Sequence, residues 1–172
     1  MSELSQSKLM VALSLEAEAA KASAEKMPLH VTVTPPFSID STNLPLFLES
    51  SDRVASSIPG FSIVGGQERY FGEDHSIRVR KIGSSTLVAV HEAFFELAHQ
   101  FDDTIDQTFA AGNYSAHSTY QGEKGFDEGQ KMDITSVDIY EKIGKMWRVN
   151  HTSLFGTIAP PELTQITVID AR

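Results

Sequence analysis

The sequence contains no cysteine, no long apolar run and no strongly basic segment. Without cysteine, a disulfide framework, a zinc ribbon and a thiol nucleophile are all excluded. No apolar run approaches the ~18 residues that a membrane-spanning helix requires. The apolar stretch 9–15 contains Ser14 and is followed at once by acidic residues, which is unlike a signal peptide. These absences predict a cytoplasmic protein that does not enter a membrane.

Positive charge is scarce, and this limits the partners of the protein. The 172 residues include 14 Lys and Arg against 23 Asp and Glu, which gives a net charge of −9. The densest basic stretch is only Arg78, Arg80 and Lys81. Proteins that grip long duplexes use extended basic surfaces, so a broad nucleic-acid platform is not expected. A small nucleotide, a cyclic nucleotide or a short RNA in a local pocket remains compatible.

The order of apolar and turn-forming residues predicts an α+β protein, and the length of residues 1–172 fits a single domain or two small lobes that share a core. Helices are predicted over 16–27, 43–58 and 86–101, with Pro45 in the first turn of the second. A polar, glycine-rich loop is predicted over 121–131. The predicted strands are 8–15, 29–34, 61–64, 68–72, 76–82, 114–120, 134–140, 146–154 and 166–169.

Two His-x-Thr triplets lie in predicted strands, one in each half of the chain. They are His30-Val31-Thr32 and His117-Ser118-Thr119. Side chains alternate across a strand, so each histidine shares a face with the threonine two residues later. Each triplet therefore presents an imidazole beside a hydroxyl.

Such a pair suits the cleavage of a phosphodiester. One group must activate the attacking oxygen and another must protonate the leaving oxygen. Histidine titrates near neutral pH, so one imidazole can be neutral while the other is charged. Hydroxyls can hold the phosphate oxygens where negative charge accumulates. The chemistry requires no metal and no cofactor, and the sequence leaves open which histidine is the acid.

The segments around these triplets resemble the 2H phosphoesterases, also called the 2′-5′ RNA ligase-like or LigT-like superfamily. The resemblance covers residues 8 to 156, and Ser118 departs from it because the middle residue of the motif is usually hydrophobic. It implies a bilobed, pseudo-two-fold fold in which antiparallel sheets line a central groove and helices lie outside. The matching segments are Leu9–Leu15 with the acidic residues after it, His30–Phe37, Ala116–Thr119 and Met132–Phe155.

The resemblance also implies roles for individual residues. His30 and His117 would be catalytic, and Thr32 and Thr119 would bind phosphate. Phe37 and Tyr120 are candidates for stacking a nucleobase, with a place in the core or at the rim as the alternative. Among the other polar residues, His91 and His99 are expected on a solvated helix face rather than at a metal site, and His151 is expected to be structural. Arg78, Arg80 and Lys81 either help to hold phosphate or form a plain exposed strand face.

The leading hypothesis is a metal-independent phosphodiesterase acting on 2′,3′-cyclic phosphates or on 2′-5′ linked nucleotides and short RNA. Within the same family, one alternative is hydrolysis of cyclic oligonucleotide immune signals, as in phage proteins that disarm bacterial immunity. A second alternative is the reverse reaction, the ligation of RNA. From a different class, the chain would be a non-catalytic module that binds a nucleotide phosphate or a protein partner. No sequence feature demands a dimer, so a monomer is predicted.

Overall fold

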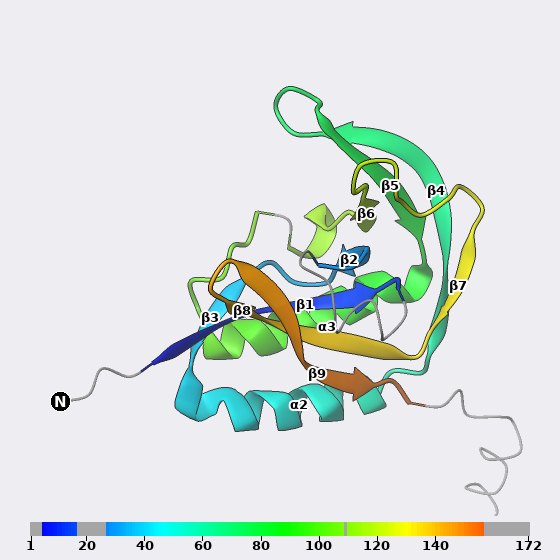
Figure 1. Cartoon of the computed structure of the whole chain (residues 1–172). Coiled ribbons are helices and arrows are strands. Elements are labelled where there is room, and N and C mark those ends of the chain that lie inside the picture. Colours follow the sequence, from blue (N-terminus) through cyan, green and yellow to red (C-terminus); the bar gives the residue numbers. More distant parts are fainter. Residues whose placement is uncertain (1–4, 17–26, 109, 157–172) are drawn as a thin grey trace, which may run out of the picture.

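A computed structural model describes residues 5–16, 27–108 and 110–156. In this part of the chain, nine strands form one curled sheet in which every pair of named strands is antiparallel (Figure 1). No helix within these residues is long and apolar enough to cross a membrane. The predicted strand 166–169, and nearly all of the predicted helix 16–27, lie outside the described residues. The α+β class predicted from the sequence is confirmed.

The strands follow the order β7-β4-β5-β6-β2-β1-β8-β9, and β3 pairs with β1 at the side of this path. Several predicted strands are confirmed with small shifts of their ends. The bounds are β1 Gln6–Ser14, β2 His30–Thr32, β3 Phe37–Asp40, β4 Phe61–Phe71, β5 Ile77–Gly83, β6 His117–Thr119, β7 Lys131–Ile134, β8 Ser136–Ile143 and β9 Met146–Leu154.

The sheet is pseudo-two-fold about its central pair, β2 and β6. One lobe continues outward through β1, β8 and β9, and the other through β5, β4 and β7. The registers of the two lobes match position by position: Ser14 lies opposite His30 as Lys81 lies opposite His117. Ala12 lies opposite Thr32 in the same way that Val79 lies opposite Thr119. The two lobes therefore repeat the same strand pairing around the two triplets.

Two α-helices begin where the sequence predicts them. Helix α2, Leu44–Ser56, follows the 3₁₀ turn η1, Ser41–Asn43, and carries Pro45 in its first turn, where a missing N–H costs no hydrogen bond. Helix α3, Ser85–Phe101, begins after Ser84, whose hydroxyl accepts from the N–H groups of Thr86 and Leu87.

The main core lies on the face of the sheet that the helices cover. Alternate residues of β1, which include Leu9, Val11 and Leu13, are fully buried there. They share one apolar cluster with Phe47 of α2 and Phe94 of α3. Among the described residues, the opposite face of the sheet holds a smaller apolar cluster, in which Met10, Ala12 and Tyr140 are buried. The helices therefore leave the second face of the central strands free for polar groups.

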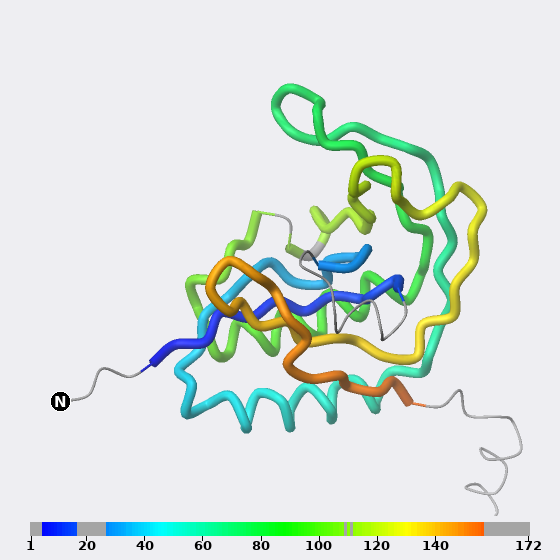
Figure 2. The backbone as a smooth tube through the Cα atoms, viewed as in Figure 1, coloured from blue at the N-terminus to red at the C-terminus, as the bar shows by residue number. Residues whose placement is uncertain are grey.

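Strand β4 differs from the prediction because it runs unbroken past Gly65-Gly66. The pairing with β5 shifts between Gly65 and Glu68, which marks a bulge instead of a chain reversal. A Cβ atom on Gly65 would lie 1.9 Å from the carbonyl oxygen of Asp127. The glycine is thus required by the close approach of the loop before β7. The β4–β5 hairpin extends away from α2, as the backbone trace shows (Figure 2).

Strands β3 and β7 were not predicted, and the predicted strand 114–120 is shorter than expected. Residues Ala111–Asn113 form the 3₁₀ turn η2, and only His117–Thr119 pair as β6. β3 pairs with the first half of β1, and β7 pairs with the first half of β4. Each of these short strands of four residues is fixed by a partner distant in the chain, so local patterning carries little signal for it.

Candidate functional site

The central strand pair brings the two His-x-Thr triplets together. Val31 lies opposite Ser118, so the antiparallel register places His30 beside Thr119 and Thr32 beside His117. Val31 is fully buried, and Ser118 is only 1% exposed. Their neighbours, the two histidines and two threonines, project to the other face and are half-buried or exposed. The four residues predicted from the motifs therefore lie on one face of the sheet, with each histidine beside the threonine of the other strand.

Both imidazoles are anchored in the same way. The Nδ1 atom of His30 lies 2.8 Å from the carbonyl oxygen of Pro28, and that of His117 lies 2.8 Å from the carbonyl oxygen of Ser115. A carbonyl oxygen only accepts, so we assign the proton of each neutral imidazole to Nδ1. The Nε2 atom of each ring is then the one that can take up or release a proton.

The surroundings favour the neutral form of both rings. Burial lowers the pKa of His30, the carbonyl of Pro28 opposes this effect, and the charge on His117 lowers the pKa further. Burial also lowers the pKa of His117, with Ser115 opposing and the Lys81 cation adding to the effect. Because His117 acts on His30, simultaneous protonation is unfavourable, and the pair can hold one neutral and one protonated ring.

Lys81 of β5 lies on the same face as the histidines. It is opposite His117 in the register, and its Nζ atom donates to the Ser115 hydroxyl. Ser115 also supplies the carbonyl that anchors His117. Burial lowers the pKa of Lys81, and the nearby Arg69 cation lowers it further. Of the three basic residues noted in the sequence, Lys81 is thus the one placed beside a triplet.

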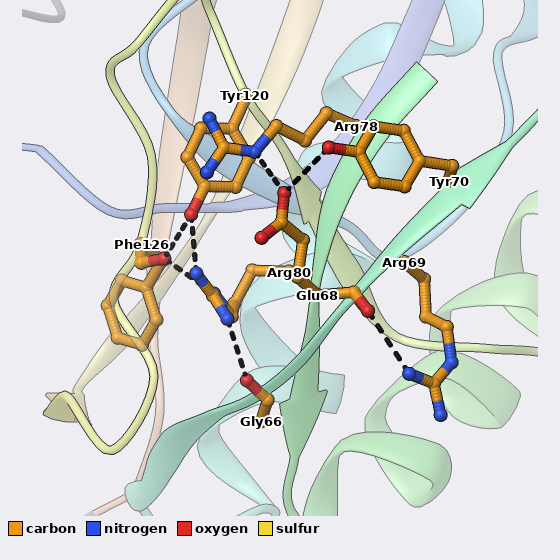
Figure 3. Close-up of polar contacts among 8 residues, drawn as sticks. All are labelled: Gly66, Glu68, Arg69, Tyr70, Arg78, Arg80, Tyr120 and Phe126. Carbon is orange, nitrogen blue, oxygen red and sulfur yellow. Dashed lines mark hydrogen bonds and ion pairs between the residues drawn. The ribbon is translucent and has the colours of Figure 1, made fainter. Parts of the chain in front are cut away.

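Arg78 and Arg80 project to the opposite face of β5, where they hold the second lobe together (Figure 3). Arg80 is 8% exposed and donates to the carbonyl oxygens of Phe126, at 2.9 Å, and Gly66, at 3.1 Å. It also donates to the Tyr120 hydroxyl at 2.6 Å. Arg78 forms an ion pair with Glu68. These contacts show a structural role for both arginines.

The β4–β5 hairpin contributes an aromatic ring that the sequence did not reveal. The centroids of Phe71 and His117 are 4.8 Å apart, with an edge-to-face angle of 72°. In a flat sheet β4 and β6 would be about 10 Å apart, because β5 lies between them. The contact therefore requires the sheet to curl toward the histidines. Alternation in 68–72 indicates that Arg69 and Phe71 share a face. Only the pairing with β5 shows that this face is the one that carries the histidines.

Half-buried Tyr114 and buried His91 form hydrogen bonds to the backbone at the end of the first triplet. The Tyr114 hydroxyl donates to the carbonyl oxygen of Thr32 at 2.7 Å, and the His91 Nδ1 atom lies 2.7 Å from the carbonyl oxygen of Val33. The rings of His91 and Tyr114 stack at 3.9 Å. Burial raises the pKa of Tyr114, so its hydroxyl stays a donor. Sequence reasoning missed Tyr114.

The prediction of a solvated helix face was wrong for His91, which is 1% exposed. It lies on the side of α3 that buries Leu87, Val90 and Phe94. His99, near the end of the same helix, is exposed as expected.

Two candidate substrate contacts are contradicted by the structure. Phe37 is 2% exposed and packs on Phe47 with centroids 5.3 Å apart, so it belongs to the core. Tyr120 follows the alternation of β6 to the face opposite the histidines. There the Arg78 guanidinium covers its ring at 3.9 Å, and Arg80 binds its hydroxyl. Neither ring is therefore placed to stack a base beside the triplets.

His151 contacts a residue of α2. The Nε2 atom of His151, on β9, lies 2.7 Å from Asp52 of α2, which confirms a structural role. Among the described residues, no group of three or more His, Asp or Glu side chains is placed to hold a metal ion.

Comparison with solved structures shows which proteins share this architecture. TT0787 of Thermus thermophilus aligns with a TM-score of 0.61 at 14% identity, covering 88% of this chain and 99% of that one. A structure described as a phosphoesterase gives 0.60 at 12% identity, covering 89% and 100%. Escherichia coli LigT complexed with 3′-AMP gives 0.58 at 11% identity, covering 89% and 100%. The chain has the LigT-like 2H phosphoesterase fold.

This LigT-like fold is shared over nearly the whole length of those proteins, although few residues are identical. No protein-family model matches the sequence, and no curated protein matches it. The fold rests on strand order and packing, which many sequences can satisfy, so it survives at 11–14% identity. Function has to be argued from the site.

Proposed function

We propose that this LigT-like chain is a metal-independent phosphodiesterase that acts on 2′,3′-cyclic phosphates or on 2′-5′ linked nucleotides and short RNA. His30 and His117 are the general acid and base, and Thr32 and Thr119 bind the phosphate. The observation that carries the proposal is the matched pair of imidazoles, each anchored through Nδ1 at 2.8 Å, on one face of the β2–β6 pair.

The proposed reaction on a 2′,3′-cyclic phosphate is a single in-line displacement. The neutral imidazole takes a proton from water at Nε2, and the water oxygen forms a bond to phosphorus. The bond from phosphorus to one ribose oxygen breaks, and the second, protonated imidazole delivers its proton to that oxygen. The products are a ribose hydroxyl and a phosphate monoester, and the two rings have exchanged protonation states.

For a 2′-5′ linked substrate, the 3′-hydroxyl of the same ribose replaces water as the attacking group. The 5′-oxygen of the next nucleotide leaves with the proton from the imidazolium, and a 2′,3′-cyclic phosphate remains. The hydroxyls of Thr32 and Thr119 donate to the non-bridging oxygens, where charge increases in the transition state. Each threonine lies beside the histidine of the other strand, and this placement supports the role.

The comparisons support the reaction class. A phosphoesterase and LigT share the fold, and LigT has been crystallised with 3′-AMP, a nucleoside monophosphate. Opening of an adenosine 2′,3′-cyclic phosphate would yield such a monophosphate. This likeness supports a nucleotide ligand without fixing the base or the chain length.

The test compares hydrolysis by the wild type, His30→Ala and His117→Ala in the presence of a chelator. The panel holds 2′,3′-cyclic mononucleotides, 2′-5′ linked dinucleotides and trinucleotides, a 3′-5′ dinucleotide and cyclic dinucleotides and trinucleotides. Each substitution is expected to lower kcat by at least about 100-fold, the usual contribution of a general acid or base. His99→Ala, which removes an exposed histidine of α3, is the matched control and keeps wild-type activity.

Two results would contradict the proposal. Activity that survives either substitution would show that the imidazoles are not the acid and base, and inhibition by the chelator would show that a metal takes part. If nothing is cleaved but nucleotides bind, the chain is a binding module in which the two triplets hold phosphate without turnover.

A further inference from the structure

The two lobes have matching strand registers but opposite chemistry at equivalent positions. In each lobe, one residue of the strand next to the central pair lies opposite the histidine. The following strand, β8 in one lobe and β4 in the other, carries a polar residue and an aromatic residue at matching positions. Ala12 and Val79 are equivalent, and their outer partners are Asp138 and Arg69. The equivalent pairs are Ser14 and Lys81, Asp138 and Arg69, and Tyr140 and Phe71.

The lobe that carries His30 is acidic at these positions, and its polar groups are paired with one another. Asp138 is 1% exposed, and it accepts from Ser14 and, at 2.6 Å, from Thr152. The Tyr140 hydroxyl lies 2.6 Å from the Ser14 hydroxyl. These positions hold a carboxyl and two hydroxyl groups and no cation, so they offer no charged donor to a second phosphate.

The lobe that carries His117 is cationic at the same positions, and its cations lack anionic partners. Arg69 is exposed and donates only to the Glu68 backbone and the neutral Gln67 side chain. Lys81 donates to the Ser115 hydroxyl. Neither forms an ion pair with a carboxylate of the described residues.

Arg69 and Lys81 are also close enough to influence each other. Burial is the largest cause of the lowered pKa of Lys81, and the Arg69 charge is the second. Figure 3 shows the Arg69 side chain leading away from the side chains of Glu68, Tyr70 and Arg78. On that far face Arg78 forms an ion pair with Glu68, and the Tyr70 hydroxyl donates to the same carboxylate. Two adjacent unneutralised cations repel, and a bound anion would relieve that repulsion.

Phe71 lies beside both His117 and Lys81. Its ring meets His117 edge to face at 4.8 Å, and Lys81 Nζ lies 5.9 Å from its centroid. A half-buried aromatic ring in this position offers a surface on which a base or ribose can stack.

We propose that Arg69 and Lys81 bind a second phosphate of the substrate, with Phe71 packing against the nucleoside between the two phosphates. The inference rests on the proposed function and deepens it. The preferred substrate then carries at least one phosphate besides the one that is cleaved, as an oligonucleotide does, whether linear or cyclic. Because Arg69 and Lys81 both lie in the lobe of His117, the second phosphate binds on that side and sets the direction of the substrate along the β2–β6 pair.

The experiment compares a 2′-5′ linked adenylate trinucleotide, with two phosphates, and the corresponding dinucleotide, with one. The wild type is expected to give a trinucleotide-to-dinucleotide ratio of kcat/KM well above one. Arg69→Gln is expected to lower that ratio about tenfold, the effect of losing one charge-assisted hydrogen bond. Lys81→Gln lowers it as well. Arg53→Gln, which removes an exposed arginine of α2, leaves the ratio unchanged.

A binding arm separates this inference from the proposed reaction. The His30→Ala/His117→Ala double variant is titrated with the trinucleotide over a range of salt concentrations. Loss of one phosphate contact lowers the slope of log affinity against log salt by about 0.7 for a single strand. Arg69→Gln introduced into the double variant is expected to reduce the slope by that amount.

The outcomes distinguish the two proposals. If the wild type cleaves the panel but its ratio is near one, or is unchanged by Arg69→Gln, the second phosphate site is overturned and the reaction stands. If nothing is cleaved but trinucleotide binding depends on Arg69 as expected, the reaction is overturned and the phosphate site stands.

Discussion

At the scale of single residues, the two histidines have the same anchor and different neighbours. Both bond a carbonyl two positions earlier in the chain through Nδ1. His117 additionally has the Phe71 ring and the Lys81 cation beside it. Because Lys81 disfavours a second positive charge, it biases His117 toward the neutral form. A charge on His117 in turn lowers the pKa of His30, so in the proposed reaction the pair holds a single proton.

The pH dependence of the reaction follows from the two imidazoles. One must be neutral and the other protonated, so kcat/KM plotted against pH is expected to be bell-shaped. Both pKa values are lowered from the ordinary 6.5, so the maximum lies below that pH. Lys81→Met removes a cation and raises the pKa of His117, which moves one limb to higher pH. Rate profiles of the wild type and Lys81→Met measure the shift.

Lys142→Met, which removes an exposed lysine of β8, is the control and leaves the profile unchanged. An equal shift in both variants would show that the pH of this limb depends on the net charge of the protein and not on the contact of Lys81 with the site. A profile that lacks a histidine limb would remove the two imidazoles from the mechanism.

The two triplets and the aromatic candidates beside them in the sequence take different positions in the structure. The two triplets lie on one face because alternation is a local property of strands. Phe37 and Tyr120 were placed by proximity in the sequence, and the structure puts both away from that face. Phe71 and Arg69 lie 46 and 48 positions before His117 in the chain and reach the site only through pairing of β4 with β5.

At the scale of elements, β2 and β6 are so short that contacts from other elements must fix their positions. Each has three residues, and they share the central position of the sheet. Tyr114 and His91 add hydrogen bonds to the carbonyls of Thr32 and Val33, which tie β2 to α3 and to the segment before β6. The first triplet is thus positioned by Tyr114 and His91, which bind its backbone and the residue after it.

Tyr114→Phe removes one of these bonds and keeps the ring. We expect a loss of about 1 kcal/mol in the free energy of unfolding, the usual net value of a hydrogen bond. We also expect kcat to fall about tenfold with little change in KM, because Thr32, which we propose binds phosphate, is displaced and not removed. Urea unfolding and steady-state kinetics measure the two effects.

Tyr70→Phe is the matched control, since the Tyr70 hydroxyl donates to Glu68 on the exposed far face. A loss of stability in Tyr114→Phe without a loss of kcat would mean that the bond serves the fold alone.

The bulge in β4 permits a second prediction at this scale. A Cβ on Gly65 would fall 1.9 Å from the Asp127 carbonyl oxygen, so the loop before β7 must move to admit it. Gly65→Ala is expected to lower the free energy of unfolding by about 3 kcal/mol, the upper part of the range for overpacking. Gly112→Ala, where a Cβ meets no atom within 4 Å, is the control. Similar stability of the two variants would show that the loop yields easily.

At the scale of the whole molecule, the lobes share one core although their strands form two symmetric halves. The main apolar cluster joins Leu9 and Val31 of one lobe to Ile63 and Ile82 of the other. It also includes side chains of both α-helices. A continuous core of this kind predicts that neither lobe is stable without the other.

Unfolding is therefore expected to be one cooperative transition. Trp147, the single tryptophan, lies on β9 at one end of the sheet, whereas far-UV circular dichroism reports on both lobes. Urea titrations followed by Trp147 fluorescence and by circular dichroism should give the same midpoint. A fluorescence midpoint clearly below the other would show that the β8–β9 lobe unfolds alone, and would contradict the prediction of one domain.

The sequence by itself determined the α+β class, the ranges of α2 and α3, and the shared face of each histidine with its threonine. These depend on helical or strand periodicity within a few residues. Tertiary structure decided that the two triplets meet, that Lys81 and not Arg78 or Arg80 joins them, and that Phe71 covers His117. Each of those facts depends on which strands pair and in which register. Pairing is set by burial across the whole sheet, so no local pattern contains it.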